Sequence, residues 1–261
     1  MNKIAIITGA TSGIGKSFAE NLASEGYDLI ITGRRKEIIE SVASDIKTSY
    51  KVNVEVKVLE LTNEVELEQF INYIEKKDNI EGLINNAGHG AGDSFTKDLY
   101  ENQENMIKLH ILLATRLSYI VSNKMKKNKK GFIINVSSLA GFNAFPTSAM
   151  YCATKGFLIS FSQSLAMELA KDNIRVQVLC PGFVRTDFHS KLNMDDKKFK
   201  NKGLIKWMIP DEVVKYSLKM IKKPFKVIVI PGHGNRMIYQ CLKFIPKKIY
   251  YKIASKSWEL L

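Results

Sequence analysis

The 261-residue sequence predicts an α/β fold, in which repeated βαβ units surround a parallel sheet. Short apolar runs rich in β-branched residues alternate with longer segments of helical period, which is the pattern of such units. The length suits one domain and is somewhat short for two. No Pro-, Gly- or Ser-rich linker and no internal repeat interrupts the alternation. We therefore expect a single domain, over residues 1–235.

The elements follow one another along the chain. Each expected strand is an apolar run, and these runs cover residues 4–8, 27–32, 54–59, 82–85, 132–136, 175–179 and 226–230. The expected helices cover residues 14–25, 36–47, 65–76, 99–126, 151–171 and 211–221. The stretch 185–210, after the sixth strand, is polar, Lys-rich and without clear period. We expect a lid over a substrate site there.

Composition and cysteine usage exclude several classes of protein. With 45% hydrophobic and 25% charged residues, the chain is neither collagen-like, mucin-like nor disordered. Cys152, Cys180 and Cys241 form no CxxC pair, so we expect no disulfide framework and no Cys-rich zinc site. No apolar run approaches the roughly 18 residues of a membrane span, and the first expected strand leaves no room for a signal peptide. A cytoplasmic location is expected.

A glycine-rich loop joins the first strand to the first helix. Residues 8–15 read TGATSGIG. Glycines permit a tight turn and let the backbone approach a pyrophosphate, which the free N–H groups and positive dipole end of the helix attract. An ordinary flexible turn is the alternative. The spacing departs from GxGxxG, because three residues separate Gly9 from Gly13.

This loop and four further motifs together resemble the short-chain dehydrogenase/reductase family. The motifs are NNAG at 85–88, Ser138, YCATK at 151–155 and Pro181-Gly182, and the match covers roughly residues 3–232. The resemblance implies a Rossmann-type three-layer αβα sandwich with seven parallel strands in order 3-2-1-4-5-6-7. It also implies a nicotinamide cofactor at the C-terminal edge of the sheet, and a homodimer or homotetramer formed through the long central helices.

The end of the second strand favours NADPH over NADH. NAD-preferring sites usually place an acidic residue there, whereas this strand ends in Arg34-Arg35 without a carboxylate. Arginine pairs bidentately with phosphate, although a solvated Arg pair is the alternative. Glu60 takes the place of the Asp that the family often has at the adenine. The resemblance implies cofactor contacts by Gly9, Thr11, Ser12, Gly13, Ile14, Gly15, Arg34, Arg35, Glu60, Leu61, Asn86, Ala87, Gly88, Tyr151, Lys155, Pro181, Gly182, Val184 and Thr186.

Ser138, Tyr151 and Lys155 form the expected catalytic set. Tyr151 and Lys155, four residues apart, lie on one face of a helix. A phenol with its ordinary pKa of about 10 exchanges protons poorly near neutrality. Lys155, with the positive nicotinamide ring of the oxidised complex, is expected to lower that pKa, so that Tyr151 is the general acid/base. Ser138 would donate a hydrogen bond to the carbonyl oxygen of the substrate. The alternatives are structural roles, with Tyr151 as a packed ring, Lys155 as a solvated amine and Ser138 as a helix or turn cap.

His110 departs from the family pattern. The family commonly has an Asn in this helix, where it helps to hold a water of the proton relay. An imidazole holds a water too, with its tautomer set by its neighbours, so His110 is a candidate for a supporting catalytic role. An altered relay is the alternative. The other histidines have no ligand spacing to one another or to cysteine, so no metal site is expected.

The expected substrate walls are apolar, which favours a hydrophobic carbonyl or alcohol. They are formed by Phe142, Phe145, Phe183, Phe188, Leu192 and Trp207. We expect an NADPH-dependent oxidoreductase that moves hydride between the nicotinamide and this substrate. A catalytically weak dinucleotide-binding sensor or scaffold is the alternative, which the departure at His110 keeps open.

A basic amphipathic extension is expected at residues 236–261. Residues 191–261 carry 17 Lys and Arg against 5 Asp and Glu, so most of the net charge of +13 lies in this part of the chain. Pro246 splits the extension into two short pieces in which aromatic residues and lysines interleave. It either lies on an anionic membrane or packs on the body or a second subunit. A nucleic-acid partner is not expected, since no recognition motif accompanies the charge.

Overall fold

The computed structural model describes residues 2–90, 93–187, 203 and 206–259, without the side chains of 257–259. The described residues form seven strands in one sheet of order β3-β2-β1-β4-β5-β6-β7, with every neighbouring pair parallel. The predicted fold and strand order are confirmed. The strands are β1 (Ile4–Ile7), β2 (Asp28–Gly33), β3 (Val54–Val58), β4 (Ile80–Asn85), β5 (Gly131–Val136), β6 (Ile174–Leu179) and β7 (Ile228–Val229).

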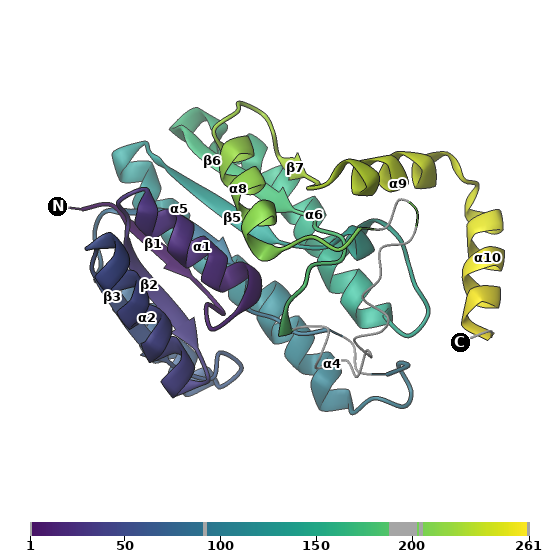
Figure 1. Ribbon diagram of the computed structural model, residues 1–261, viewed down its shortest axis with the longest axis horizontal. Coiled ribbons are helices and arrows are strands. Elements are labelled where there is room, and N and C mark those ends of the chain that lie inside the picture. The colour runs from purple at the N-terminus through teal and green to yellow at the C-terminus, as the bar shows by residue number, and fades with distance from the viewer. Residues whose placement is uncertain (1, 91–92, 188–202, 204–205, 260–261) are drawn as a thin grey trace.

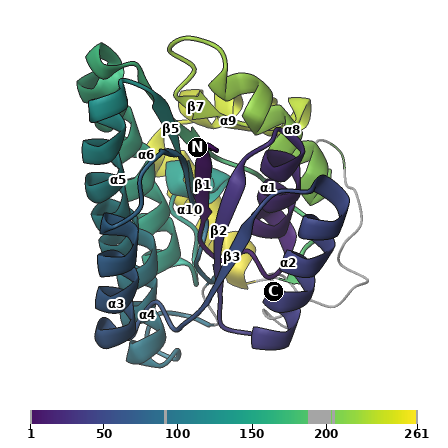
Figure 2. The same cartoon turned by 90° about the vertical axis from the view of Figure 1, so that its left-hand side faces the viewer.

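Helices cover both faces of the sheet, as Figure 2 shows. One layer contains α1 (Gly13–Ser24), α2 (Lys36–Tyr50) and α8 (Pro210–Ile221). The other contains α3 (Glu64–Glu75), α4 (Tyr100–Ile107), η1 (Lys108–Leu113), α5 (Ala114–Asn128) and α6 (Ala149–Leu169). Two single-turn 3₁₀ segments, η2 (Leu139–Phe142) and η3 (Ala170–Asp172), flank α6.

Each layer has its own apolar core. In β1 and β2, Ile7 and Ile31 pack with α1, α2 and α8, while Ile6 and Ile30 pack with α3 and α5. Successive side chains of a strand point to opposite faces, so a strand covered on both sides must be apolar throughout. This burial explains why the strands read as continuous apolar runs.

Two elements differ from prediction. The helix expected over 99–126 is interrupted by η1, a π-helical segment that contains His110. Segments of this kind occur frequently at functional sites, and the regular apolar period gives no sign of one. The strand expected over 226–230 is only two residues long, because β7 is an edge strand with β6 as its neighbour and Pro231 follows closely.

The C-terminal extension forms two helices. α9 (His233–Phe244) begins three residues earlier than the expected extension, and α10 (Lys247–Glu259) follows Pro246, which separates the two as predicted. In Figure 1, α10 projects beyond the rest of the molecule. Within the described part of the chain, none of the helices is long and apolar enough to cross a bilayer.

Candidate active site

The loop between β1 and α1 has glycine at three positions where a side chain would be strained or would clash. Gly9 and Gly13 have φ values of +70° and +56°, which favour glycine. A Cβ on Gly15 would overlap the carbonyl oxygen of Gly9, and one on Gly9 would come within 2.9 Å of Ala87. The backbone is therefore free of side chains at these three glycines, where the chain turns into the N-terminus of a helix. This arrangement fits the pyrophosphate of a dinucleotide.

Hydrogen bonds join the end of β4 to the end of β1. The hydroxyl of Thr8 accepts hydrogen bonds from the backbone N–H groups of Asn86 and Ala87, each at 3.0 Å. The Asn86 amide donates in return to the carbonyls of Thr8 and Gly9, also at 3.0 Å. The NNAG motif thus lies against the glycine loop at the C-terminal edge of the sheet. The loop and motif come together here as the sequence predicts.

Both predicted arginines stand at the turn from β2 into α2. Arg35 donates to the hydroxyls of Thr11 (3.0 Å) and Ser12 (3.3 Å) in the glycine loop. Arg34 forms an ion pair of 3.0 Å with Glu60. Burial opposes ionisation of Glu60, but hydrogen bonds from Arg34 and Thr62 outweigh it and lower the pKa of the carboxyl. The Glu60 carboxylate is therefore engaged by protein groups, while the neighbouring Leu61 is buried in the core.

The segment after β6 packs against the glycine loop. A Cβ on Gly13 would come within 2.8 Å of the Thr186 side chain. Val184 forms an isolated parallel bridge with Met208, which joins the two ends of the expected lid. Trp207 lies 4.9 Å from Phe183, between ring centroids, near that junction. Of the lid itself, residues 188–202 and 204–205, including Phe188 and Leu192, lie outside the described residues.

Pro181 and Gly182 anchor two further elements. The Pro181 carbonyl accepts a hydrogen bond of 3.0 Å from the N–H of Leu139, at the start of η2. A Cβ on Gly182 would come within 2.5 Å of the buried Asn235 of α9, so only glycine fits this approach. Asn235 in turn donates to the Pro231 carbonyl at 2.8 Å. The motif therefore couples the site to the C-terminal helices.

Ser138, Tyr151 and Lys155 come together at the C-terminal edge. Tyr151 and Lys155 share a face of α6, and Ser138, directly beyond β5, is hydrogen-bonded to Tyr151. Lys155 donates to the carbonyl of Val136 at 3.0 Å. The preceding residue, Ser137, is also a serine, but it is buried and donates to the backbone carbonyl of Lys155 at 2.8 Å. Of the two serines, Ser138 is therefore the one that reaches the phenol.

Burial dominates the pKa values of this set. Burial raises the pKa of Tyr151 to about 12, although its hydrogen bond with Ser138 lowers it. Burial also lowers the pKa of Lys155 to about 8. Lys155 by itself therefore does not make the phenol acidic, because the lost hydration of the phenolate outweighs the charge of an amine 5.7 Å from the ring centroid. That Lys155 and the nicotinamide ring of the oxidised complex together lower this pKa stays a prediction. Near pH 7 the phenol carries its proton.

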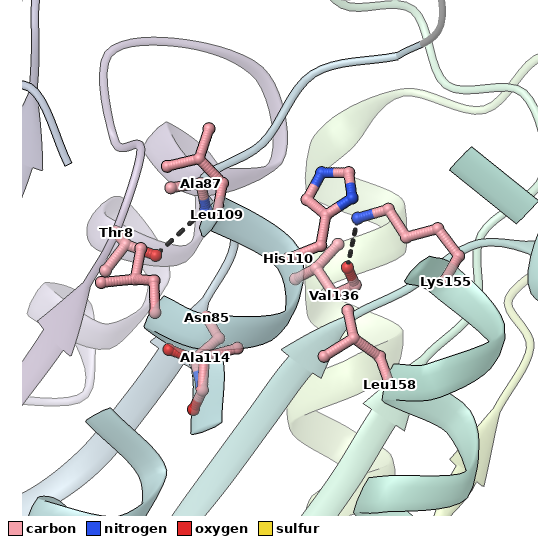
Figure 3. A pocket seen from close by; sticks show the side chains of 10 residues that line it. Thr8, Asn85, Ala87, Leu109, His110, Ala114, Val136, Lys155 and Leu158 are labelled. Atoms are coloured by element: carbon pink, nitrogen blue, oxygen red, sulfur yellow. Dashed lines mark hydrogen bonds between the residues drawn. The ribbon is translucent and has the colours of Figure 1, made fainter. Parts of the chain in front are cut away.

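His110 lies in the same site and is only 2% exposed. Its ring centroid is 6.1 Å from that of Tyr151, and its Nδ1 lies 2.9 Å from the Thr154 hydroxyl. A small cavity, just large enough for a water molecule, is lined by His110 and Lys155 among others, and Figure 3 shows the amine ending beside the imidazole. Burial, then the charges of Lys155 and His89, hold the pKa of His110 well below its ordinary value. The imidazole is neutral at pH 7.

Sequence reasoning missed the polar residues that support this set. Thr154 lies within the YCATK motif, but its contact with His110 depends on how η1 packs against α6. The buried amide of Asn85 donates to Asn135 at 2.8 Å, and Asn135 donates to Ser162 of α6 at 2.9 Å. The sequence signal for this network is the presence of polar residues inside otherwise apolar strands, since buried polar groups need hydrogen-bond partners.

The fold and the site together define a nicotinamide-dinucleotide oxidoreductase of the Rossmann type. Residues 3–197 match the short chain dehydrogenase family, and the chain belongs to that family. The predicted resemblance is thereby confirmed. The protein is an NAD(P)-dependent short-chain dehydrogenase/reductase.

Relatives and solved structures agree with this assignment. Over 217 residues the chain is 34% identical to the 3-oxoacyl-acyl-carrier-protein reductase of Aquifex aeolicus, which covers 81% of this chain and 86% of that protein. A short-chain dehydrogenase from Sphingobium yanoikuyae, in complex with NADPH, is 29% identical, with a TM-score of 0.83 and 92% of each chain covered. The bulky-bulky ketone specific alcohol dehydrogenase of Comamonas testosteroni is 26% identical, with a TM-score of 0.78, covering 99% of this chain and 93% of that one.

Proposed function

We propose that the protein is an NADPH-dependent reductase of carbonyl compounds, or a dehydrogenase of the corresponding alcohols, with Tyr151 as its general acid/base. One observation carries the proposal: a phenol, hydrogen-bonded to Ser138, shares a helix face with a buried amine at the C-terminal edge of the sheet. The bare glycine loop at the same edge supports a dinucleotide beside them.

Each residue of the set has a separate task. When bound, the nicotinamide supplies or accepts a hydride. Tyr151, protonated near neutral pH, donates its proton to the carbonyl oxygen in reduction. Ser138 hydrogen-bonds to that oxygen as negative charge develops there. Lys155, anchored by the Val136 carbonyl, places a positive charge near the tyrosinate that remains.

Replacing Tyr151 by Phe tests the proposal. The variant keeps the ring but loses the proton donor, so we expect turnover of any active carbonyl to fall at least 100-fold while NADPH binding changes less than about 3-fold. A panel of carbonyls followed by NADPH absorbance measures turnover, and fluorescence titration measures binding. Tyr100→Phe, at an exposed tyrosine of α4, is the matched control.

Two outcomes would contradict the proposal. If Tyr151→Phe kept its turnover, another group would supply the proton. If the wild-type protein bound the dinucleotide but turned over no member of the panel, the sensor or scaffold alternative would be favoured.

NADPH is the proposed cofactor, in preference to NADH. Arg34 and Arg35 flank the turn after β2, and Arg35 lies against the glycine loop. A 2′-phosphate near them would receive charge-assisted hydrogen bonds, whereas no acidic residue ends β2 to accept from a free ribose hydroxyl. The NADPH complex of the Sphingobium relative supports this preference.

A hydrophobic carbonyl or alcohol is the proposed substrate. The rings of Phe183 and Trp207 pack together beside the lid junction. Phe142 is the last residue of η2, and Phe145 lies on the loop that follows it. Among the relatives are a 3-oxoacyl-acyl-carrier-protein reductase and a bulky-bulky ketone specific alcohol dehydrogenase. We therefore propose a long or bulky apolar substrate, which such walls would desolvate.

A homodimer or homotetramer is the proposed assembly. The family generally forms oligomers. In this chain Leu112 of η1, Tyr119 of α5 and Met167 of α6 expose large apolar side chains. These three lie on the long central helices that the resemblance implies as the interface.

Contact with an anionic membrane is the proposed role of α10. Ile249 and Ile253 are more than half exposed and lie one helical turn apart. Lys252 and Lys256 follow on the adjacent exposed arc of the same helix. An amphipathic helix that exposes both kinds of side chain suits a surface of anionic headgroups over an apolar interior.

A further inference from the structure

Both arginines at the turn from β2 into α2 are paired with carboxylates of this chain. Arg34 Nη1 lies 3.0 Å from Glu60 Oε2, and Arg35 Nη2 lies 3.6 Å from Asp187 Oδ2. Glu60 comes shortly after β3 and Asp187 lies in the segment after β6, so the two carboxylates reach the turn from different parts of the chain. Each cation of the proposed phosphate site therefore has a negative partner within the protein.

The two carboxylates differ in how firmly they are held. Glu60 Oε1 accepts hydrogen bonds from the backbone N–H and the hydroxyl of Thr62, at 3.2 and 2.9 Å. Burial opposes ionisation of Glu60, but these bonds and the one from Arg34 outweigh it and lower the pKa of the carboxyl. The Asp187 side chain is 53% exposed, and its ion pair is the longer one. Glu60 is thus a fixed counter-charge, whereas the pair between Asp187 and Arg35 lies open to solvent.

Arg35 is shared between this ion pair and the glycine loop. Its Nη2 donates to the hydroxyls of Thr11 and Ser12, at 3.0 and 3.3 Å, and the same nitrogen faces Asp187. The glycine loop and the carboxylate after β6 therefore meet at one guanidinium. A phosphate that binds Arg35 has to share it with Asp187 or displace that carboxylate.

A carboxylate beside the arginines affects the two dinucleotides unequally. The 2′-phosphate of NADPH carries a charge of about −1.5 to −2 near pH 7, which a neighbouring carboxylate repels. NADH has an uncharged hydroxyl at that position, so the same carboxylate costs it little. Removal of either carboxylate would leave an arginine with its whole charge available to the phosphate.

We propose that Glu60 and Asp187 are specificity-determining residues, which restrain the preference for NADPH by engaging Arg34 and Arg35 in ion pairs. The inference rests on the proposed function, because it takes these arginines as the ones that receive the 2′-phosphate. It adds that the strength of the preference is set by carboxylates from two other segments of the chain.

Binding of both dinucleotides to charge-removing variants tests the proposal. Asp187→Asn and Glu60→Gln keep the size of each side chain and remove its charge. We expect each to lower Kd for NADPH about 3-fold or more with Kd for NADH changed less than about 2-fold, by fluorescence titration. Asp187→Glu keeps the charge and should match the wild type. Asp45→Asn, at an exposed carboxylate further along α2, is the matched control.

Salt separates an electrostatic role from a structural one. Removing a counter-charge leaves more positive charge for the phosphate, and salt screens charges that are exposed. Kd for NADPH should therefore rise more steeply with NaCl in Asp187→Asn and Glu60→Gln than in the wild type, whereas the salt dependence for NADH should not change. A structural role would instead weaken the binding of both dinucleotides together.

An unchanged ratio of the two Kd values in either variant would overturn the proposal, as would equal weakening of both dinucleotides. Circular dichroism identifies a variant that fails to fold, in which case the other one decides. If Arg34→Asp shifts the cofactor ratio while the carboxylate variants do not, this inference fails and the phosphate assignment stands. If Arg34→Asp also leaves the ratio unchanged, both fail.

Discussion

At the scale of single residues, burial decides the protonation of Tyr151 and Lys155, the proposed catalytic pair. The same loss of hydration raises the pKa of Tyr151 to about 12 and lowers that of Lys155 to about 8, so both groups are driven toward their neutral forms. A protonated phenol suits reduction, because the acid is ready before the substrate arrives. The buried ammonium, in contrast, destabilises the folded chain at neutral pH.

Lys155→Met should therefore stabilise the protein while inactivating it. The lowering of the Lys155 pKa from 10.5 to about 8 means that the buried charge destabilises the folded state by about 3 kcal/mol. Removing the charge recovers this free energy, but the variant also loses the hydrogen bond to Val136, which costs about 1 kcal/mol. We expect the variant to be about 2 kcal/mol more stable at pH 7, by urea denaturation. Between pH 8 and 10.5, Lys155 is protonated in the unfolded wild type but not in the folded wild type, so the stability of the wild type rises with pH. The difference in stability between the variant and the wild type therefore narrows by roughly 1 kcal/mol at pH 9.

The control for this comparison is Lys127→Met, at an exposed lysine of α5, which should change stability by less than about 0.5 kcal/mol. A Lys155→Met variant that is less stable than the wild type at pH 7 would show that the amine is fully compensated in the folded state.

At the scale of elements, short irregular segments carry the site and regular ones support it. The π-helical η1 contains His110, and the turn between β2 and α2 presents Arg34 and Arg35. The sequence located the turn between β2 and α2 correctly, because the residue types at the end of the strand and the start of the helix mark both boundaries. Neither the π-helical segment nor the pairing of Arg34 with Glu60 was predicted, because both depend on neighbours distant in sequence.

Arg34→Asp tests the turn. The substitution removes a cation and adds a repulsive charge, and each charge-assisted hydrogen bond lost is worth about 1.5–3 kcal/mol. We expect KM for NADPH to rise at least 10-fold with KM for NADH changed less than 3-fold, as measured by initial rates with both cofactors. Lys47→Ala removes a positive charge from the exposed far end of α2 and should leave the ratio unchanged. An unchanged cofactor ratio in Arg34→Asp would refute the phosphate assignment.

At the scale of the whole molecule, the C-terminal helices reach the substrate side of the sheet. Tyr239 of α9 packs on Phe142 at 4.4 Å between ring centroids. Tyr250 of α10 donates a 2.6 Å hydrogen bond to the carbonyl of Ala144 and lies against Phe145. The extension therefore packs on the body through these tyrosines and still exposes lysines and isoleucines of α10. Of the alternatives left open by the sequence, the structure shows packing on the body, while contact with a membrane stays a proposal.

The Lys248→Glu/Lys252→Glu double variant tests the proposed membrane contact. Each lysine near an anionic surface contributes about 1 kcal/mol, so reversing two should weaken binding at least about 30-fold. Sedimentation with vesicles of phosphatidylglycerol and phosphatidylcholine measures it, and vesicles of phosphatidylcholine alone are the control. Lys126→Glu/Lys127→Glu on α5 matches the change in charge and should bind like the wild type. If the wild-type chain never sediments with the anionic vesicles, the membrane contact is refuted.

The sequence by itself determined the fold, the strand order through its family motifs, and the choice of Ser138, Tyr151, Lys155 and the glycine loop as the candidate site. It did so because apolar periodicity and glycine spacing are local properties, and local properties can be read along one chain. Only the tertiary structure decided the direction of the Tyr151 and Lys155 pKa shifts, the contact between His110 and Thr154, and the carboxylate that engages Arg34. These depend on burial and on partners from other elements, which exist only after the helices have packed on the sheet.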